Sequence, residues 1–217
     1  RSSGDRAGNM ADKNELVFVP LGGVGEIGMN LALYGYGPAS AREWIIVDCG
    51  VTFPTPELPG VDLVLPDTRF IEENLQSLRG MVITHAHEDH YGAVLDIWPR
   101  LGGVPVWMTP ISAGLLAAKR ASEPGSPQVP VKIYNAGDSF TVGPFNIEAV
   151  AVNHSIPEPV SLAITSPAGT VVHTGDWKID PEPTIGPLID EARFRAFGGK
   201  GVLALVCDST NALREGE

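Results

Sequence analysis

The 217-residue chain has only two cysteines, no long apolar run and no cluster of basic residues. Cys49 and Cys207 do not stand at the spacing of a zinc knuckle or of a CxxC redox motif, so we expect both to be buried, free thiols. A membrane-spanning helix needs a stretch of about 18 or more apolar residues, and the sequence contains none. No segment has the pattern of a secretory signal peptide. These absences predict a cytoplasmic protein without a membrane anchor.

Basic residues are scarce relative to acidic ones. The chain has 15 Lys and Arg against 26 Asp and Glu, which gives a net charge of −11 at pH 7. Proteins that bind nucleic acids usually present a basic patch, because contacts to phosphate dominate their affinity. Lys119, Arg120 and Lys178 are candidates for local phosphate contacts, but none belongs to a longer basic run. The composition therefore argues against a simple nucleic-acid-binding module.

Histidine is also rare, yet three of the five histidines lie within residues 85–90, His-Ala-His-Glu-Asp-His. The apolar run at 81–84 before them predicts a buried strand, and residues 91–98 after them predict the start of a helix. Three imidazoles and a carboxylate at such a turn are typical ligands of zinc and related divalent metals. The alternative interpretation is a solvated loop that happens to be rich in histidine.

The spacing within this segment separates the candidate ligands into two sets. Residues two apart in an extended loop project to the same side, so His85 and His87 are expected to bind one ion together. Asp89 and His90 stand where the chain begins to coil and point elsewhere, so they are candidates for a second ion.

Further candidates stand at the ends of predicted strands. His154 follows the alternating run 147–153, and Asp176 follows the β-rich run 170–175, which ends in a glycine turn. Asp176 is placed to bridge two ions, which in such sites lie about 3.5–4 Å apart. His173 stands three residues before Asp176 and is expected to be a core histidine or a support for the ligands.

Length and patterning predict the architecture. A chain of 217 residues with 43% hydrophobic residues can bury a sizeable core in one or two domains. Strands predominate, helices flank them and no repeat is present, which predicts the α/β (α+β) class and a four-layer αββα sandwich. The expected strands lie near 15–20, 29–36, 44–48, 81–84, 104–108, 131–134, 138–142, 145–152, 160–166, 169–174 and 201–206. The expected helices lie near 68–77, 91–100 and 110–121.

The first residues differ from the rest of the chain. Residues 1–13 are polar, small and unpatterned, which predicts a disordered leader or a vector-derived extension ahead of Met10. Residues 14–217 are therefore the part that we expect to fold.

One glycine-rich segment imitates a nucleotide-binding motif. Gly23–Gly28 satisfies GxGxxG, follows a predicted strand and precedes Asp48 by twenty residues. The dinucleotide fingerprint requires a helix directly after the glycines, whereas residues 29–38 alternate as a strand and then break at Gly and Pro. We therefore expect a tight hairpin loop near the rim of the site, and we expect Asp48 to orient a metal-bound histidine.

The motifs together resemble a known family. Residues 85–90 resemble the HxHxDH signature of the metallo-β-lactamase fold, and Asp48, His154 and Asp176 match the positions of its other motifs. A narrower resemblance, to bacterial ribonuclease J of the β-CASP branch, runs from about Leu16 to the C-terminus. It depends on five segments in the same order: 20–30 (PLGGVGEIGMN), 58–67 (LPGVDLVLPD), 153–159 (NHSIPEP), 172–180 (VHTGDWKID) and 208–212 (DSTNA).

The resemblance implies a larger enzyme. A ribonuclease of this family resembles a metallo-β-lactamase domain that a β-CASP domain interrupts, and the present chain ends about where that insertion would begin. The chain is then expected to be the N-terminal part of the metallo-β-lactamase domain. The family's last metal-binding histidine and most of the RNA-binding surface are expected beyond it.

The resemblance also assigns the metal-binding roles at a site with two Zn²⁺ ions. The implied ligands are His85, His87 and His154 for the first ion, Asp89 and His90 for the second, and Asp176 as the bridge. Asp89, His90 and Asp176 are then the expected catalytic residues, because they hold the ions at the activated water.

The implied reaction is hydrolysis of RNA phosphodiester bonds in RNA maturation, rRNA processing and RNA decay. Family members act as 5′-to-3′ exonucleases and as endonucleases, and the full-length enzyme is expected to be a homodimer or homotetramer. Ser209 and Thr210 are candidates for a phosphate contact, or alternatively cap a helix after the strand at 201–206. Two alternatives stay open: a small-molecule hydrolase of the thioesterase or lactamase type, and an inactive folded fragment of the nuclease.

Overall fold

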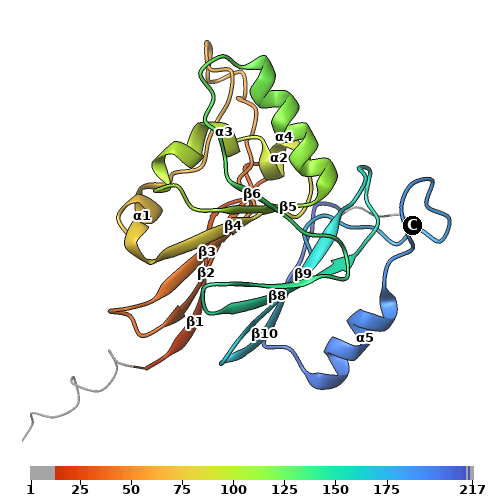
Figure 1. The fold of residues 1–217 in the computed structure, drawn as a ribbon. Helices are drawn as coiled ribbons and strands as arrows, with labels where there is room; N and C mark the ends of the chain where they lie inside the picture. Colours follow the sequence, from red (N-terminus) through yellow and green to blue (C-terminus); the bar gives the residue numbers. More distant parts are fainter. Residues whose placement is uncertain (1–12, 214, 216–217) are drawn as a thin grey trace, which may run out of the picture.

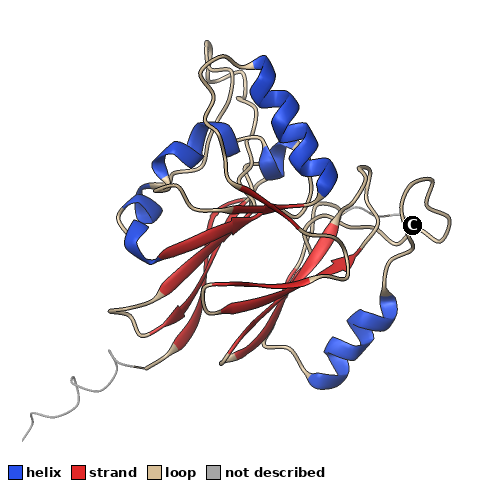
Figure 2. Ribbon diagram, viewed as in Figure 1, coloured by secondary structure: helices blue, strands red, loops and turns tan. Residues whose placement is uncertain are grey.

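The computed structural model describes residues 13–213 and 215, so the expected leader lies outside the described residues except for Lys13. Two β-sheets pack face to face, and the helices lie on their outer sides (Figure 1; Figure 2). The predicted four-layer αββα sandwich is therefore confirmed. Within the described residues, no helix combines the length and the apolar character that crossing a lipid bilayer requires.

The first sheet contains six strands in sequential order. They are β1 (Glu15–Gly22), β2 (Leu31–Gly37), β3 (Glu43–Val47), β4 (Leu78–Val82), β5 (Val106–Met108) and β6 (Val131–Ile133). β1, β2 and β3 pair antiparallel, whereas β3, β4, β5 and β6 pair parallel. The parallel part delivers the carboxyl ends of β3 and β4 to one edge, which is where an α/β sheet gathers residues into a site.

The second sheet contains five strands in the order β11-β10-β9-β8-β7. They are β7 (Ser139–Val142), β8 (Phe145–Ala151), β9 (Val160–Ser166), β10 (Gly169–His173) and β11 (Ala204–Val206). All pairs are antiparallel except β10 with β11.

The helices cover the two sheets unequally. α1 (Arg69–Glu72), α2 (Glu88–Tyr91), α3 (Val94–Ile97) and α4 (Pro110–Ser122) lie over the first sheet, and α5 (Glu191–Lys200) lies over the second (Figure 1). α4 begins where the Thr109 hydroxyl accepts the backbone N–H of Ser112 and Pro110 occupies the first turn, a favoured way to start a helix.

The core explains why β3 is apolar at successive positions. Ile45 and Val47 pack between the two sheets, whereas Trp44 and Ile46 pack beneath the helices of the first sheet. Both faces of the strand are buried, so it has no polar side. A third, smaller cluster joins Val172 of β10 to Phe197 of α5.

Two predicted helices are shorter and broken. The helix expected at 68–77 ends at Glu72 and is followed by a 3₁₀ turn at Leu75–Ser77. The helix expected at 91–100 begins earlier, at Glu88, is interrupted after Tyr91 and ends in a 3₁₀ turn that contains Pro99. Pro99 lacks a backbone N–H and disfavours helical geometry at the preceding residue, which accounts for that change.

One helix was not predicted, and the structure tests two further predictions. α5 was not predicted; its apolar side consists mainly of Phe194 and Phe197. Cys49 is buried as expected, but Cys207 is exposed, so that prediction was wrong for the second thiol. The segment after Gly28 forms β2, with no helix, so the structural context of a dinucleotide site is absent there.

Candidate metal centre

The histidine-rich turn lies at the carboxyl end of β4 and leads directly into α2. His87 has an extended backbone immediately before the helix, which begins at Glu88. The segment thus changes from extended to helical between His87 and Asp89, as the two-set interpretation of the sequence requires. The rings of His85 and His87 are 5.0 Å apart between centroids, and those of His85 and His90 are 4.1 Å apart.

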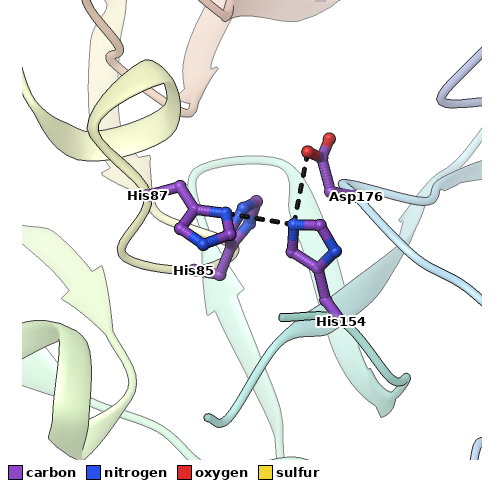
Figure 3. A group of neighbouring side chains, drawn as sticks. All are labelled: His85, His87, His154 and Asp176. Atoms are coloured by element: carbon purple, nitrogen blue, oxygen red, sulfur yellow. Dashed lines mark hydrogen bonds and ion pairs between the residues drawn. The ribbon is translucent and has the colours of Figure 1, made fainter. Parts of the chain in front are cut away.

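A first group brings together four residues from three segments. The group consists of His85, His87, His154 and Asp176, and one potential ligand atom from each lies within 4.8 Å of the others. His154 follows β8, and Asp176 follows β10 after Gly175, whose φ is +57°. His154 Nε2 lies 3.0 Å from His87 Nδ1 and 3.5 Å from Asp176 Oδ2 (Figure 3).

The donor atoms of this group fit a divalent metal ion. Among the residues described, His85 Nε2 is the one buried side-chain nitrogen or oxygen that lacks a hydrogen-bond partner. Leaving such an atom unsatisfied costs about 1–3 kcal/mol. Burial, reinforced by the charge of His90, lowers the pKa of His85 well below its usual value, and burial also lowers the pKa of His154. These neutral imidazoles present lone pairs, and with Asp176 they form a set typical of zinc.

A second group shares Asp176 with the first. It consists of Asp89, His90 and Asp176, again with ligand atoms within 4.8 Å of one another. His90 Nε2 lies 3.1 Å from Asp176 Oδ1 and 3.7 Å from Asp89 Oδ2. Burial acts to raise the pKa of Asp176, but the bond with His90 outweighs it and the pKa falls to about 2. Asp176 is therefore ionised and offers one oxygen to each group.

Asp48 supports His90 from the opposite side. Asp48 Oδ2 lies 2.7 Å from His90 Nδ1, so that nitrogen donates and Nε2 faces the second group. The backbone N–H of Thr84 donates to Asp48 Oδ1 at 2.8 Å, and the Thr84 hydroxyl donates to the same carboxylate. Asp48 has a φ of +63°, a rare conformation for a non-glycine residue. Burial acts to lower the pKa of His90, but Asp48 and Asp176 raise it to about 10.

The remaining predicted residues lie outside both groups. His173 Nδ1 is 2.9 Å from the hydroxyl of Tyr34, and burial lowers the pKa of His173 to about 4. Thr210 is occupied locally, because its backbone N–H and hydroxyl both donate to Asp208 Oδ1. Ser209 and Thr210 are exposed and are followed by a turn instead of the helix that the capping alternative required.

A cleft of about 410 Å³ opens beside the second group. Its walls are the loop Gly22–Gly28 on one side and residues 206–210 on another, and Asp89, His90 and Asp176 line it. His154 instead lines a separate cavity of about 290 Å³. Asn30 also lines the cleft and contacts the second group, although the sequence analysis did not single it out. No local sequence pattern predicts this contact, because Asn30 and His90 are 60 residues apart in the chain.

The two packed sheets, the outer helices and the paired His/Asp groups are those of a domain of the metallo-β-lactamase type, and the comparisons agree. The model of the "Beta-lactamase superfamily domain" matches residues 43–197, so the chain belongs to this superfamily. Among solved structures, a protein of unknown function from Enterococcus faecalis aligns with a TM-score of 0.62 at 19% identity, over 94% of this chain and 52% of that one. A metallo-β-lactamase fold protein from Bacillus subtilis aligns with a TM-score of 0.51 at 17% identity, over 78% of this chain and 65% of that one.

Curated relatives narrow the similarity to Ribonuclease J. The chain is 65% identical over 208 residues to Ribonuclease J of Sinorhizobium meliloti, which covers 96% of this chain and 37% of that protein. It is 41% identical over 206 residues to Ribonuclease J of Corynebacterium glutamicum, covering 95% of this chain and 28% of that protein. The resemblance found in the sequence is thus confirmed, and the chain spans about a third of the length of these relatives.

Proposed function

We propose that this chain contributes the metal-binding part of a zinc-dependent ribonuclease that hydrolyses RNA phosphodiester bonds. The single observation that supports it most is the pair of ligand groups joined through Asp176 at the edge of an open cleft. Identity of 65% to a Ribonuclease J over 208 residues supports RNA as the substrate. Both 5′-to-3′ exonucleolytic and endonucleolytic cleavage, in RNA maturation, rRNA processing and decay, belong to the proposal.

The proposed ligands follow from the two groups. His85, His87 and His154 are assigned to the first ion and Asp89 and His90 to the second, with Asp176 between them. Two bound metal ions supply Lewis-acid activation of a water near neutral pH and offset charge on the phosphate oxygens. Zn²⁺ is the proposed metal, because imidazole and carboxylate ligands in a set of four suit it.

Contacts within the chain orient the proposed ligands for metal binding. Asp48 fixes the ring of His90 so that Nε2 points to the second group, and Thr84 fixes Asp48 in turn. Asp176 is ionised and is therefore available to both groups. The proposed ligands lie on the segments that follow β4, β8 and β10, and the structure already brings their ligand atoms together.

The acidic surface makes substrate binding depend on the ions. Asp89, Asp176 and Asp208 line the cleft, and the chain carries a net charge of −11. A polyanionic substrate is repelled by these carboxylates until bound cations offset them. We therefore expect RNA affinity to fall when the metal is removed, beyond the loss of cleavage.

The wider assignments rest on the relatives alone. RNA as partner, a homo-oligomeric full-length enzyme and a cytoplasmic location are proposed from the similarity to Ribonuclease J. Ser209 and Thr210, at the mouth of the cleft, are proposed phosphate contacts once the Thr210 hydroxyl turns from Asp208.

Competing substrates test the proposal directly. Purified protein with Zn²⁺ or Mn²⁺ is incubated with end-labelled, 5′-monophosphorylated RNA and, in parallel, with a chromogenic lactam and a thioester. We expect cleavage of RNA only, abolished in Asp89→Ala, and stronger in a full-length protein that contains this chain. Turnover of the lactam or thioester without RNA cleavage would favour a small-molecule hydrolase, and cleavage by the full-length protein alone would make this chain an inactive part of it.

A further inference from the structure

Asn30 contacts both Asp89 and His90 of the second group, although it belongs to neither ligand group. The backbone N–H of Asn30 donates to the carbonyl oxygen of Asp89 at 2.9 Å. Its side-chain Nδ2 lies 3.1 Å from the same oxygen, 3.4 Å from Asp89 Oδ2 and 3.1 Å from His90 Nε2. Backbone and side chain of one residue therefore both hold Asp89.

These contacts suit a metal-supporting role. An amide nitrogen has two N–H donors, and two acceptors of Asp89, its carbonyl oxygen and Oδ2, lie within reach of it. His90 Nε2 pairs with Asp176 Oδ1 at 3.1 Å, so it is not an acceptor for this amide. With an ion in the second group, both donors of Asn30 are left for the oxygens of Asp89. Hydrogen bonds of this kind orient ligating carboxylates and contribute to metal affinity.

The glycine-rich loop keeps Asn30 in this position. The Oδ1 atom of Asn30 lies 2.2 Å from where a Cβ on residue 23 would stand, so no side chain fits at Gly23 while Asn30 keeps its place. Gly23 has a φ of +81°, and Gly25 has a φ of +76°. A Cβ on Gly25, in contrast, meets no atom within 4 Å. The two glycines thus share the same backbone requirement and differ in the contact with Asn30.

We propose that Asn30 is a positioning residue for the second metal ion, and that Gly23 is a glycine because the Asn30 amide needs its space. The inference rests on the proposed metal site and assigns a purpose to the GxGxxG-like segment, which no nucleotide-binding helix follows. The loop at the rim of the cleft and the metal ligands at its floor are then one structural unit, coupled through Asn30.

Calorimetric titration of metal-free protein with Zn²⁺ tests the proposal in four variants. Asn30→Ala is expected to weaken the second binding event about 10- to 100-fold and to leave the first unchanged. Gly23→Ala is expected to weaken the second event similarly, although residue 23 touches no ligand. Gly25→Ala is the matched control and should bind both ions as the wild type does. Asn30→Asp places a carboxylate at the second group and should bind that ion more tightly than Asn30→Ala.

A measurement without metal guards against general misfolding. The unfolding midpoints of metal-free Asn30→Ala, Asp89→Ala and the double variant should be non-additive, because residues in contact couple. Additive shifts, or equal behaviour of Gly23→Ala and Gly25→Ala, would overturn the proposal. A wild type that binds no second ion would overturn both this inference and the proposed function. Normal second-ion binding in Asn30→Ala would overturn this inference alone.

Discussion

The two ligand groups share Asp176, yet the protein prepares them in opposite ways. In the first group, His85 Nε2 has no partner, and burial lowers the pKa of His85 and His154, so these rings are neutral. In the second group, His90 bonds Asp48 through one nitrogen and lies beside Asn30 and Asp176 with the other, and its pKa is about 10.

This difference determines which existing contacts a metal ion must replace when it binds to each group. An ion in the first group would give His85 Nε2 the partner that it lacks and would replace the contact between His87 and His154. An ion in the second group displaces a proton and an ion pair that already satisfy the protein. The second group also opens on the larger cleft. We therefore expect the first group to bind its ion more tightly, and the second group, which lines the larger cleft, to exchange its ion more readily.

The largest expected effect is loss of the first ion. His85→Ala or His87→Ala removes one of the four residues of the first group, so the affinity of this group for Zn²⁺ should fall by orders of magnitude. Elemental analysis after exhaustive dialysis should find metal in the wild type and far less in either variant. His173→Gln is the control, since His173 lies outside both groups and should keep its metal. Wild-type metal content in both alanine variants would remove the contrast between the groups.

The second-largest expected effect is a difference in Zn²⁺ affinity between the first and the second group. The first group offers four ligand residues and the second offers three, one of them shared. Two nearby cations also repel each other. Calorimetry with Zn²⁺ should therefore give one tight and one weak site. Two tight sites of equal affinity would show that a further residue completes the second group, and His173 would be the first to examine by substitution.

The sequence predicted the ligands better than their supports. The candidate ligands could be predicted from their residue types and from their positions after predicted strands. The structure brings them together: His85, His87, Asp89, His90, His154 and Asp176. The positive φ of Asp48 and the contact of Asn30 with His90 depend on pairing of distant segments, so no local pattern contains them. The glycine loop was predicted as a hairpin, but the reason for Gly23 needs the position of the Asn30 side chain.

The helices and strands also differ in how well local sequence patterns predict them. β3, whose two faces are both buried, is predicted by its apolar run alone. β4 begins at Leu78, three residues before the predicted strand, because Arg79 and Gly80 interrupt its apolar pattern. α5 was missed because only Phe194 and Phe197 mark its buried side and Gly198 and Gly199 weaken its helical signal. Cys207 is exposed because its neighbours on β11 lie at the edge of the second sheet, which composition does not reveal.

The third prediction uses pH on metal-free protein. The pKa of His173 is about 4 against an ordinary value of 6.5, so the unfolded state takes up a proton that the folded state refuses. The contribution of His173 to the free energy of unfolding should be fully present above pH 6.5 and should be lost as the pH drops toward 4, by at most about 3 kcal/mol. His90, whose pKa is raised, acts oppositely: its contribution is full below pH 6.5 and is lost as the pH rises through about 10.

Urea unfolding in the presence of a chelator, at pH 4 to 10, measures the free energy of unfolding along both the acidic limb (pH 4 to 6.5) and the alkaline limb (pH 6.5 to 10) of the profile. His173→Gln should flatten the acidic limb and leave the alkaline limb in place. A flat profile in the wild type, or an alkaline limb that is unaffected by Asp48→Asn, would show that His90 does not gain a charged partner in the folded state.

A smaller effect is expected when the support of His90 is removed. Asp48→Asn keeps a residue that tolerates the positive φ and keeps an oxygen for Thr84, but it replaces the acceptor of His90 Nδ1. Affinity at the second site should fall about 10- to 100-fold while the first site is unchanged. Asp67→Asn is the control, an exposed carboxylate that pairs with Arg69 instead. Equal weakening of both sites by Asp48→Asn would mean that the groups are not separately supported.

The smallest expected effect concerns the two thiols. Cys49 follows Asp48, is buried, and donates its backbone N–H to the carbonyl oxygen of His90 at 2.7 Å, so its thiol is reached only when this support opens. Burial, with Asp48 nearby, also raises the pKa of Cys49, whereas Cys207 is exposed and should react with iodoacetamide at once. Asp48→Asn should speed the labelling of Cys49 about 5-fold, the equivalent of roughly 1 kcal/mol for one lost hydrogen bond, with no change at Cys207. Mass spectrometry of the labelled peptides separates the two rates. An unchanged Cys49 rate would place the opening motion elsewhere, and the stability of the second group would then have to come from Asn30 and Asp176 without Asp48.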